Sequence, residues 1–263
     1  MRNQRHSYVF GASTGIGAAV ARELISNGFF VHGFSRSSPL WAGEVSNFCW
    51  HHLDFNTPSS VDQAIKEALD AADGKAEFIA YSAVYYGSAR SRVIDMQLDE
   101  WYRQFNVNLH GLAIVLRALL PSLEKANPGI ILNISSEVVF NGGPDRAGYA
   151  ATKAAAASLV NSVAQEYDTD RIRTVQVLPV AMVDTPGIRN RRPVHFDYSS
   201  YMQPDSFRPI IHEIVVTSAL DLAGRTLVIN HDGSWKDIGN QLVPSQSRPS
   251  EPPGMPIFLL NEE

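Results

Sequence analysis

Cysteine is nearly absent from this sequence: Cys49 is the one thiol among 263 residues. A single cysteine excludes an internal disulfide framework and any metal site built only from thiolates. The neighbours of Cys49, NFCWHHL at 47–53, are largely apolar or aromatic. We therefore expect Cys49 to be a small buried hydrophobe rather than a nucleophile, and we predict no metal site.

Positive charge and long hydrophobic runs are also scarce. The formal net charge is -5, so the chain offers no basic surface for nucleic acid or for an anionic membrane. No segment approaches the roughly 18 uninterrupted apolar residues of a membrane span. The first ten residues, MRNQRHSYVF, lack the apolar segment of a signal peptide. We expect a cytoplasmic protein without nucleic-acid or membrane partners.

Two kinds of segment alternate along the chain. Short runs rich in β-branched and aromatic residues alternate with longer runs of helical periodicity, and several of the short runs are apolar throughout, as in a sheet covered on both faces. This order predicts an α/β fold, a Rossmann-like doubly wound parallel sheet of about seven strands with helices on both faces. The predicted strands are 7–11, 29–34, 48–55, 77–83, 129–135, 172–178 and 225–230, and the predicted helices are 15–27, 58–72, 98–126, 145–168 and 205–220.

One domain accounts for residues 1–240, because no linker interrupts the alternation before its end. The segment 241–263 then carries five prolines followed by the apolar IFLL. We interpret it as a proline-rich tail rather than a second domain, with the prolines as an extended spacer. Its apolar end either docks on a neighbouring subunit or near the site, or contributes nothing to function.

The first predicted strand leads directly into GASTGIG, which opens a helix. Glycines at such a turn let the backbone approach a pyrophosphate, whose charge is stabilised at the helix N-terminus. An ordinary glycine-rich turn is the alternative, but the position after the first strand favours a dinucleotide site. Its predicted cofactor-binding residues are Gly11, Ser13, Thr14, Gly15, Ile16 and Gly17.

The end of the second strand indicates which dinucleotide binds. NAD-binding proteins usually place an acidic residue there, whereas this chain reads GFSRSS at 33–38. Arg36 is suited to pair with a 2′-phosphate, to which Ser35 and Ser37 would donate, so we predict NADP(H) in preference to NAD(H). The alternative for Arg36 is a solvated loop charge. Asp54, after the third strand, either reaches the adenine amine or caps a turn.

A tyrosine and a lysine stand four residues apart in GYAATKAAAAS at 148–158, at the start of an alanine-rich helix. At this spacing the side chains of Tyr149 and Lys153 share one helix face. A free phenol titrates near pH 10, and a nearby ammonium stabilises the phenolate and lowers its pKa. Hydride addition to a carbonyl needs a proton donor of this kind, because negative charge builds up on the oxygen.

Four features occur in this order along the chain: the glycine turn, NVNLHG at 106–111, NISSE at 133–137 and YAATK at 149–153. Together they resemble the short-chain dehydrogenase/reductase family in its short single-domain branch. The resemblance covers residues of about 7 to 235, and Ser136 precedes Tyr149 by 13 residues, as in the family. It implies Tyr149 as general acid/base, Ser136 as a donor to the substrate oxygen, Lys153 on the nicotinamide ribose, and Asn108 in a water-mediated proton relay. It also implies cofactor contacts from Ser82, Ala83, Tyr149, Pro179 and Thr185.

The sequence departs from the family at several places. Phe10 replaces a threonine, Tyr81-Ser82-Ala83-Val84 replaces Asn-Asn-Ala-Gly, and Pro179 is followed by valine instead of glycine. Thr185 falls one residue later than in the family pattern. The local support of the central strands and of the cofactor must therefore be built differently, and Tyr81 and Val84 either narrow substrate access or fill core space.

The substrate is expected to bind where three segments converge: 84–92, 137–148 and the long loop 185–205, in the place of the family's substrate lid. The loop carries arginines and aromatic rings, which either recognise an anionic or aromatic substrate or are solvated charges and rings packed on the protein body. Tyr85 and Tyr86 line the pocket, or one of them belongs to the core. The basic and aromatic loop residues are Arg189, Arg191, Arg192, His195, Phe196, Tyr198 and Tyr201.

These features predict an NADP(H)-dependent oxidoreductase that reduces a ketone, or oxidises a secondary alcohol, of a small cyclic or aromatic molecule. The alternative from another class is a non-catalytic NADP(H)-binding regulator or scaffold. Sugar-nucleotide epimerisation and enoyl reduction fit less well, because the first needs a larger C-terminal domain and the second a wider tyrosine–lysine spacing. The family resemblance implies a homodimer or homotetramer, and Ala154–Ala157 permit close helix packing.

Overall fold

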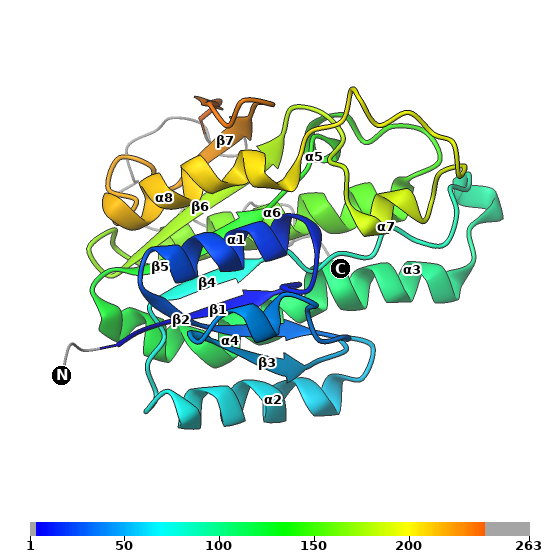
Figure 1. The fold of residues 1–263 in the computed structure, drawn as a ribbon. Coiled ribbons are helices and arrows are strands. Elements are labelled where there is room, and N and C mark those ends of the chain that lie inside the picture. Colours follow the sequence, from blue (N-terminus) through cyan, green and yellow to red (C-terminus); the bar gives the residue numbers. More distant parts are fainter. Residues whose placement is uncertain (1–3, 240–263) are drawn as a thin grey trace, which may run out of the picture.

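Seven of the eight strands in the sheet run in the same direction. The computed structural model describes residues 4–239, and its sheet has the order β3-β2-β1-β4-β5-β6-β7-β8 (Figure 1). Only β8 is antiparallel to its neighbour. This is the predicted doubly wound sheet, and the predicted tail 241–263 lies outside the described residues. The strands are β1 (Arg5–Phe10), β2 (Phe29–Ser35), β3 (Phe48–His52), β4 (Phe78–Tyr81), β5 (Gly129–Ile134), β6 (Ile172–Pro179), β7 (Arg225–Ile229) and β8 (Trp235–Asp237).

Helices cover both faces of the sheet, as predicted (Figure 1). Helices α1 (Gly15–Ser26) and α8 (Arg208–Val216) pack on one face, and α2 (Pro58–Ala71), α4 (Gly111–Leu123) and α6 (Ala147–Glu166) pack on the other. The shorter helical segments are η1 (Ala42–Glu44), η2 (Val93–Asp95), α3 (Leu98–Phe105), η3 (Asn106–His110), η4 (Glu124–Ala126), α5 (Val138–Asn141), α7 (Pro186–Arg189) and η5 (Pro204–Phe207).

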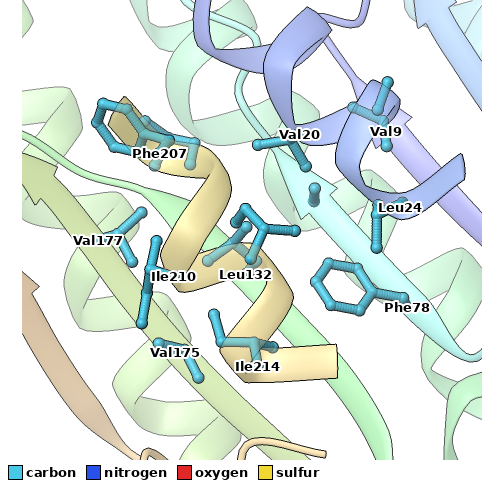
Figure 2. Close-up of a cluster of buried hydrophobic side chains, with 14 of the residues drawn as sticks. Val9, Val20, Leu24, Phe78, Leu132, Val175, Val177, Phe207, Ile210 and Ile214 are labelled. Carbon is cyan, nitrogen blue, oxygen red and sulfur yellow. The ribbon is translucent and has the colours of Figure 1, made fainter. Parts of the chain in front are cut away.

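The core on the first face forms where α1 and α8 lie over the sheet. Figure 2 shows Ile210 and Ile214 of α8 beside Val175 and Val177 of β6, with Leu24 of α1 nearby. These five side chains are fully buried. Burial of each such aliphatic side chain contributes about 1.5–3 kcal/mol, so this layer fixes α1 against the sheet and holds the glycine turn in place.

The predicted helix 98–126 is one helical stretch interrupted by a π-helical turn. The turn η3 covers Asn106–His110 and joins α3 to α4, with Asn108 buried at its centre. Single π-helical turns are frequent at functional sites. By length and composition, Leu98–Ala126 is apolar enough to span a membrane, yet Leu112, Val115 and Leu119 on its inner face are fully buried in the second core. It is therefore packed as a core helix of the sheet.

Strand β8 was not predicted, because WKD is too short to show a periodic pattern. The turn before it carries the missing signal, since an Asp-Gly pair between two segments often marks a reversal. The Asp232 carboxylate accepts hydrogen bonds from the Ser234 amide at 3.0 Å and from the Ser234 hydroxyl at 2.7 Å. This turn reverses the chain so that β8 extends the edge of the sheet.

The expectation that Cys49 is buried was wrong. Cys49 lies on β3, the edge strand of the sheet, and its side chain is exposed. The apolar sequence around it is explained by Phe48, whose ring packs on Trp41 with centroids 4.5 Å apart. An edge strand buries only part of its length, so local composition alone did not reveal which of its residues face solvent.

Three histidines form a ladder across the first strands of the sheet. The ring nitrogens of His6 and His32 are 3.2 Å apart, and those of His32 and His51 are 3.1 Å apart. His32 is 1% exposed and stacks on the Tyr8 ring. Burial lowers the pKa of all three histidines, and for His32, where His51 and His6 add to the effect, the pKa falls to about 3.

This ladder predicts a loss of stability in mild acid. Because His32 has a lower pKa when folded than when unfolded, the unfolded chain binds the proton more readily between about pH 6.5 and 3. We expect His32 to lower the free energy of unfolding by about 1.4 kcal/mol per pH unit as the pH falls through this window. Urea unfolding at pH 7.5, 6.5, 5.5 and 4.5 measures the slope. His32→Phe should reduce the change of the unfolding free energy with pH, and His195→Phe, at an exposed control position, should leave this slope unchanged. Equal slopes in the wild type and both variants would contradict the prediction.

Candidate functional site

One large cleft lies at the carboxyl ends of the parallel strands. Its volume is about 990 Å³, and it extends from the glycine turn to the tyrosine–lysine pair. The strand order reverses between β1 and β4, and ligands of doubly wound sheets bind at such a switch point. Helices α3 and α7 lie at this end of the sheet, at the right in Figure 1. Within residues 4–239, no group of three His, Cys, Asp or Glu side chains is placed to hold a metal ion.

The glycine turn has no room for side chains. Gly11 has φ +88°, and a Cβ there would lie 2.7 Å from the Ala83 amide nitrogen. A Cβ on Gly17 would overlap the carbonyl oxygen of Gly11. The two glycines therefore allow β1, the start of α1 and the end of β4 to meet closely below the cleft. Backbone packed in this way fits the close approach of a pyrophosphate.

The N-terminus of α1 is free to receive an anion. Thr14 occupies the cap position but makes no side-chain cap hydrogen bond, and the first turn carries no acidic residue. The first amide groups of a helix lack partners within it, and the helix dipole favours negative charge there. Ser13, Thr14, Gly15 and Ile16 all line the cleft. These donors fit the charge of a dinucleotide pyrophosphate.

At the end of β2, the three residues predicted to contact a 2′-phosphate, Ser35, Arg36 and Ser37, lie in different environments. Ser35 is buried; its hydroxyl donates to the Ser37 carbonyl at 2.8 Å and accepts from Trp50 Nε1 at 3.1 Å. Ser35 therefore shapes the loop. Arg36 and Ser37 are exposed and line the cleft, and no carboxylate lies within ion-pair distance of Arg36 in the described part of the chain. Sequence reasoning missed Trp50, which supports this loop from β3.

Asp54 has the turn-cap role considered for it, and its contact with the adenine amine stays a prediction. Its Oδ1 accepts from the Asn56 amide at 2.9 Å, which makes it a turn cap, and it also lines the cleft.

Thr185 caps α7 by accepting from the Ile188 amide at 3.3 Å. Further cleft-lining positions among the predicted cofactor residues are Ser82, Ala83, Pro179 and Thr185 itself.

Lys153 is buried beneath the cleft. Its Nζ donates to the Ile134 carbonyl at the end of β5, at 2.7 Å, and its side chain is 5% exposed. Burial lowers the pKa of Lys153 to about 8. The predicted lysine thus reaches the same end of the sheet as Ser136, and its charge is sensitive to mildly alkaline pH.

The expectation that Lys153 lowers the pKa of Tyr149 is wrong for this structure. Burial raises the pKa of Tyr149 well above its ordinary value, and the nearby Tyr86 raises it further, against a hydrogen bond with Ser136 that lowers it. The Tyr86 and Tyr149 ring centroids are 5.1 Å apart. Because Tyr86 covers it, Tyr149 remains a protonated phenol through the neutral range.

Ser136 belongs to a polar chain that the sequence did not reveal. Its hydroxyl donates to Glu137 Oε2 at 2.6 Å, and Glu137 Oε1 pairs with Arg146 at 3.0 Å. Arg146 also donates to Asn141 Oδ1 at 3.3 Å. The Ser136 hydroxyl must therefore rotate from Glu137 to donate to a substrate oxygen. Glu137 directly follows Ser136 in NISSE, but no spacing rule pointed to Arg146.

Asn108 holds the loop after β4. Its Oδ1 accepts from the Tyr85 amide at 2.7 Å, and its Nδ2 donates to the Tyr85 carbonyl at 2.9 Å and to Thr152 Oγ1 at 3.0 Å. Both amide protons are used. The side chain therefore ties the π-helical turn, the loop carrying Tyr85 and helix α6 together, and the part of Asn108 in a water-mediated proton relay stays a prediction.

Tyr81 provides the local support that the family's asparagine would give. Its hydroxyl donates to the Val107 carbonyl within the π-helical turn, and it is 1% exposed. Its ring contacts Phe10 and Phe55, with centroids 6.0 and 5.6 Å away. Phe10 and Tyr81, which both depart from the family's sequence pattern, therefore pack together and fill the core. Val84 by contrast lines the cleft.

Most charged and aromatic residues of loop 185–205 interact within the loop. Arg189 pairs with Asp184 through two contacts of 2.6 Å and lies over the Tyr198 ring. Phe196, Tyr198 and Tyr201 contact one another. For these residues this agrees with the interpretation as solvated charges and packed rings, since Arg189 and His195 are exposed.

Arg191 and Arg192 differ from Arg189, because both line the cleft. The Arg192 Nε donates to the Tyr201 hydroxyl at 3.2 Å, and Arg191 donates to the Gly87 carbonyl. Tyr85 and Tyr86 line the cleft as well, and the Tyr85 hydroxyl donates to Glu100 Oε2 at 2.8 Å. The loop after β4 and the loop after α7 thus meet over the catalytic tyrosine candidate.

Known proteins resemble this chain both in sequence and in fold. A family model described as short chain dehydrogenase matches residues 5–194. An uncharacterized oxidoreductase of Staphylococcus haemolyticus is 30% identical over 189 residues, 70% of this chain and 80% of the relative. A 3-alpha-(or 20-beta)-hydroxysteroid dehydrogenase of Mycobacterium tuberculosis is 29% identical over 68% of each chain. The structure of an alcohol dehydrogenase from Thermococcus sibiricus, complexed with 5-hydroxy-NADP, superposes with TM-score 0.71 and 25% identity over 88% of this chain and 98% of the other.

Proposed function

The chain belongs to the short-chain dehydrogenase/reductase family, and from this premise we propose that it is an NADP(H)-dependent oxidoreductase that reduces the ketone of a small cyclic or aromatic molecule. One observation carries the proposal: Ser136, just after β5, and Tyr149 and Lys153 of α6 line the cleft that the glycine turn also lines. The relatives named as hydroxysteroid and alcohol dehydrogenases, and the NADP derivative bound to the latter, support it.

Each candidate residue of the cleft would have its own role in the reaction. When bound, NADPH supplies the hydride that adds to the carbonyl carbon. Tyr149 donates its proton to the carbonyl oxygen, and Ser136 stabilises the charge developing on that oxygen by a hydrogen bond. Lys153 holds the cofactor ribose and places positive charge below the site. Asn108 keeps Tyr85 and its loop in position, as its three hydrogen bonds require.

The raised pKa of Tyr149 keeps this side chain in the protonated form that reduction uses. A proton donor must be protonated before it acts, and burial beside Tyr86 keeps Tyr149 in that form. Oxidation of an alcohol would instead need the phenolate, which the same burial disfavours.

Lys153 should limit reduction at alkaline pH. Its pKa of about 8 means that the ammonium loses its proton, its charge and a hydrogen-bond donor above that pH, while Tyr149 stays protonated. We expect kcat/KM for reduction to fall about tenfold per pH unit above pH 8. The measurement is a pH–rate profile from pH 6 to 10. In Lys153→Arg the decline should move beyond pH 10; a decline at the same pH in both proteins would assign it to another group.

Arg36 should decide the choice of cofactor. A guanidinium paired with a 2′-phosphate contributes about 1.5–3 kcal/mol, so NADPH should bind about 10–100 times more tightly than NADH. Fluorescence titration of both cofactors measures the ratio. Arg36→Ala should remove most of the preference, whereas the surface control Arg117→Ala, which breaks a contact with Asp62, should keep it. Equal affinity for both cofactors in the wild type would disprove the assignment.

The proposal includes a cytoplasmic homodimer or homotetramer that packs through α4 and α6. Ala154 and Ala155 are half-buried on the outer side of α6 and leave room for close helix approach, whereas Ala156 and Ala157 are buried in the chain's own core. A non-catalytic regulator would keep cofactor binding but lack turnover. The arrangement of Ser136, Tyr149 and Lys153 favours the enzyme over that alternative.

A further inference from the structure

The part of the cleft beyond Tyr149 is positively charged, although the chain as a whole carries a net charge of -5. Arginines outnumber acidic residues along this wall, and a local excess of one sign in a cleft attracts ligands of the other. The charged residues that line it are Arg90, Arg103, Arg146, Arg191 and Arg192, against Glu100, Glu137 and Asp145.

Two of these arginines are neutralised by neighbours. Arg103 pairs with Glu100 at 3.5 Å, and Arg146 pairs with Glu137 at 3.0 Å. The other terminal nitrogen of Arg146 donates to Asn141. Across residues 4–239, the remaining three, Arg90, Arg191 and Arg192, have no carboxylate within ion-pair distance. Arg90 is exposed, whereas Arg191 and Arg192 are half-buried in the cleft wall.

Arg191 is held in place without being neutralised. One terminal nitrogen donates to the Gly87 carbonyl, and the guanidinium carbon lies 5.6 Å from the centroid of the Tyr86 ring. A guanidinium has five N–H donors, so this anchoring leaves donors for a ligand. Planar anionic groups pair with such a fork through two parallel hydrogen bonds. Arg191 is therefore a fixed positive charge with hydrogen-bonding capacity to spare.

Tyr86 sets the position of this charge relative to the reaction. Its ring contacts both groups, with its centroid 5.6 Å from the Arg191 guanidinium carbon and 5.1 Å from the Tyr149 ring centroid. The Arg191 guanidinium carbon therefore lies no more than about 11 Å from the Tyr149 ring centroid. A flat ligand that contacts Tyr86 would reach from Tyr149 to Arg191.

An anion attached directly to the carbonyl carbon would meet a different environment. It would lie beside Ser136, whose hydroxyl is 2.6 Å from the Glu137 carboxylate. Arg146 is already paired with Glu137 and donates to Asn141, so the charged group in contact with the Ser136 hydroxyl is the Glu137 carboxylate. Like charges at this distance repel one another, which disfavours 2-oxo acids.

We propose that the substrate is a cyclic or aromatic ketone with an anionic group remote from its carbonyl, and that Arg191 binds this group. The inference rests on the proposed function, which places the carbonyl at Tyr149 and Ser136. Arg191 then acts as the residue that selects acidic over neutral ketones, and its contact with Tyr86, which in turn contacts Tyr149, keeps the anion within reach of the reacting end of the cleft.

Equilibrium binding tests this without requiring turnover. The probes are 4-acetylbenzoate, its methyl ester, and phenylglyoxylate, which carries its carboxylate on the carbonyl carbon. Calorimetry with the full-length protein, alone and saturated with NADP⁺, gives their dissociation constants. We expect 4-acetylbenzoate to bind at least about 10 times more tightly than the ester and than phenylglyoxylate. Arg191→Ala should weaken 4-acetylbenzoate about 10–100-fold and leave the ester within about threefold.

Arg92→Ala is the matched control, since it changes the net charge equally but removes an arginine that pairs with Asp95 outside the cleft wall. It should keep the preference. Circular dichroism and melting temperature show that each variant is folded, and Arg191→Met, which keeps an apolar stem, replaces Arg191→Ala if the latter unfolds. Equal binding of acid and ester, or equal losses in Arg191→Ala and Arg92→Ala, would overturn the inference. Failure of the proposed function is distinct: no ketone, acidic or neutral, would cause oxidation of NADPH.

Discussion

Replacing Tyr149 with phenylalanine lowers kcat for ketone reduction by about 10²–10⁴-fold, the contribution expected of a positioned proton donor. The ring remains beside Tyr86, so packing is kept and only the hydroxyl is lost. Because Tyr149 is assigned to the proton and not to the pyrophosphate, NADPH should bind with little change. Stopped-flow oxidation of NADPH gives kcat, and fluorescence titration gives the cofactor dissociation constant.

The control is Tyr102→Phe, which removes the same hydroxyl from a side chain that is 57% exposed. It should leave both quantities unchanged. If Tyr149→Phe retained more than about a tenth of the wild-type rate, the phenol would not be the proton donor, and the carbonyl oxygen would have to take its proton from water or from Ser136.

Replacing Gly17 with alanine raises the dissociation constant for NADPH at least about 100-fold. The added methyl group would overlap the Gly11 carbonyl, so the turn that receives the pyrophosphate must move. Since the same turn packs on Ser82 and Ala83, we also expect the melting temperature to fall. Titration of NADPH and thermal unfolding monitored by circular dichroism measure the two effects.

Gly43→Ala is a matched control, because a Cβ there has no atom within 4 Å and the residue lies in η1 away from the cleft. This variant should bind NADPH as the wild type does. Normal NADPH affinity in a folded Gly17→Ala protein would mean that the glycine turn is a packing feature and that the cofactor binds elsewhere.

The strand and helix pattern was predictable because the parallel strands are buried on both faces and the helices are not. Runs such as FIAY in β4 and GIILNI in β5 are wholly buried, which is why their apolar character shows in the sequence. The π-helical turn at Asn106–His110 was not predictable in the same way. It continues the helical periodicity and differs only by one inserted residue in the hydrogen-bond pattern.

The positions of the candidate site residues were predictable from joint spacing, but their electrostatics were not. Tyr149 and Lys153 do share a cleft, yet Lys153 donates to the Ile134 carbonyl, and burial controls both pKa values. Burial depends on Tyr86 and on the loop that carries Arg191, which are far from Tyr149 in the sequence. The spacing of Tyr149 and Lys153 on one helix carries no information about these neighbours.

The central claim is that Tyr149 and its neighbours reduce a ketone with a hydride from NADPH. The most direct measurement uses NADPH deuterated at the transferable C4 position and a panel of neutral and acidic aryl ketones, with mass spectrometry of the alcohol products. The account predicts an alcohol product that carries one deuterium on the former carbonyl carbon with the wild type and none with Tyr149→Phe on the same time scale. Tight NADPH binding by the wild type with no deuterated alcohol from any ketone would contradict the reductase and favour the non-catalytic cofactor-binding alternative.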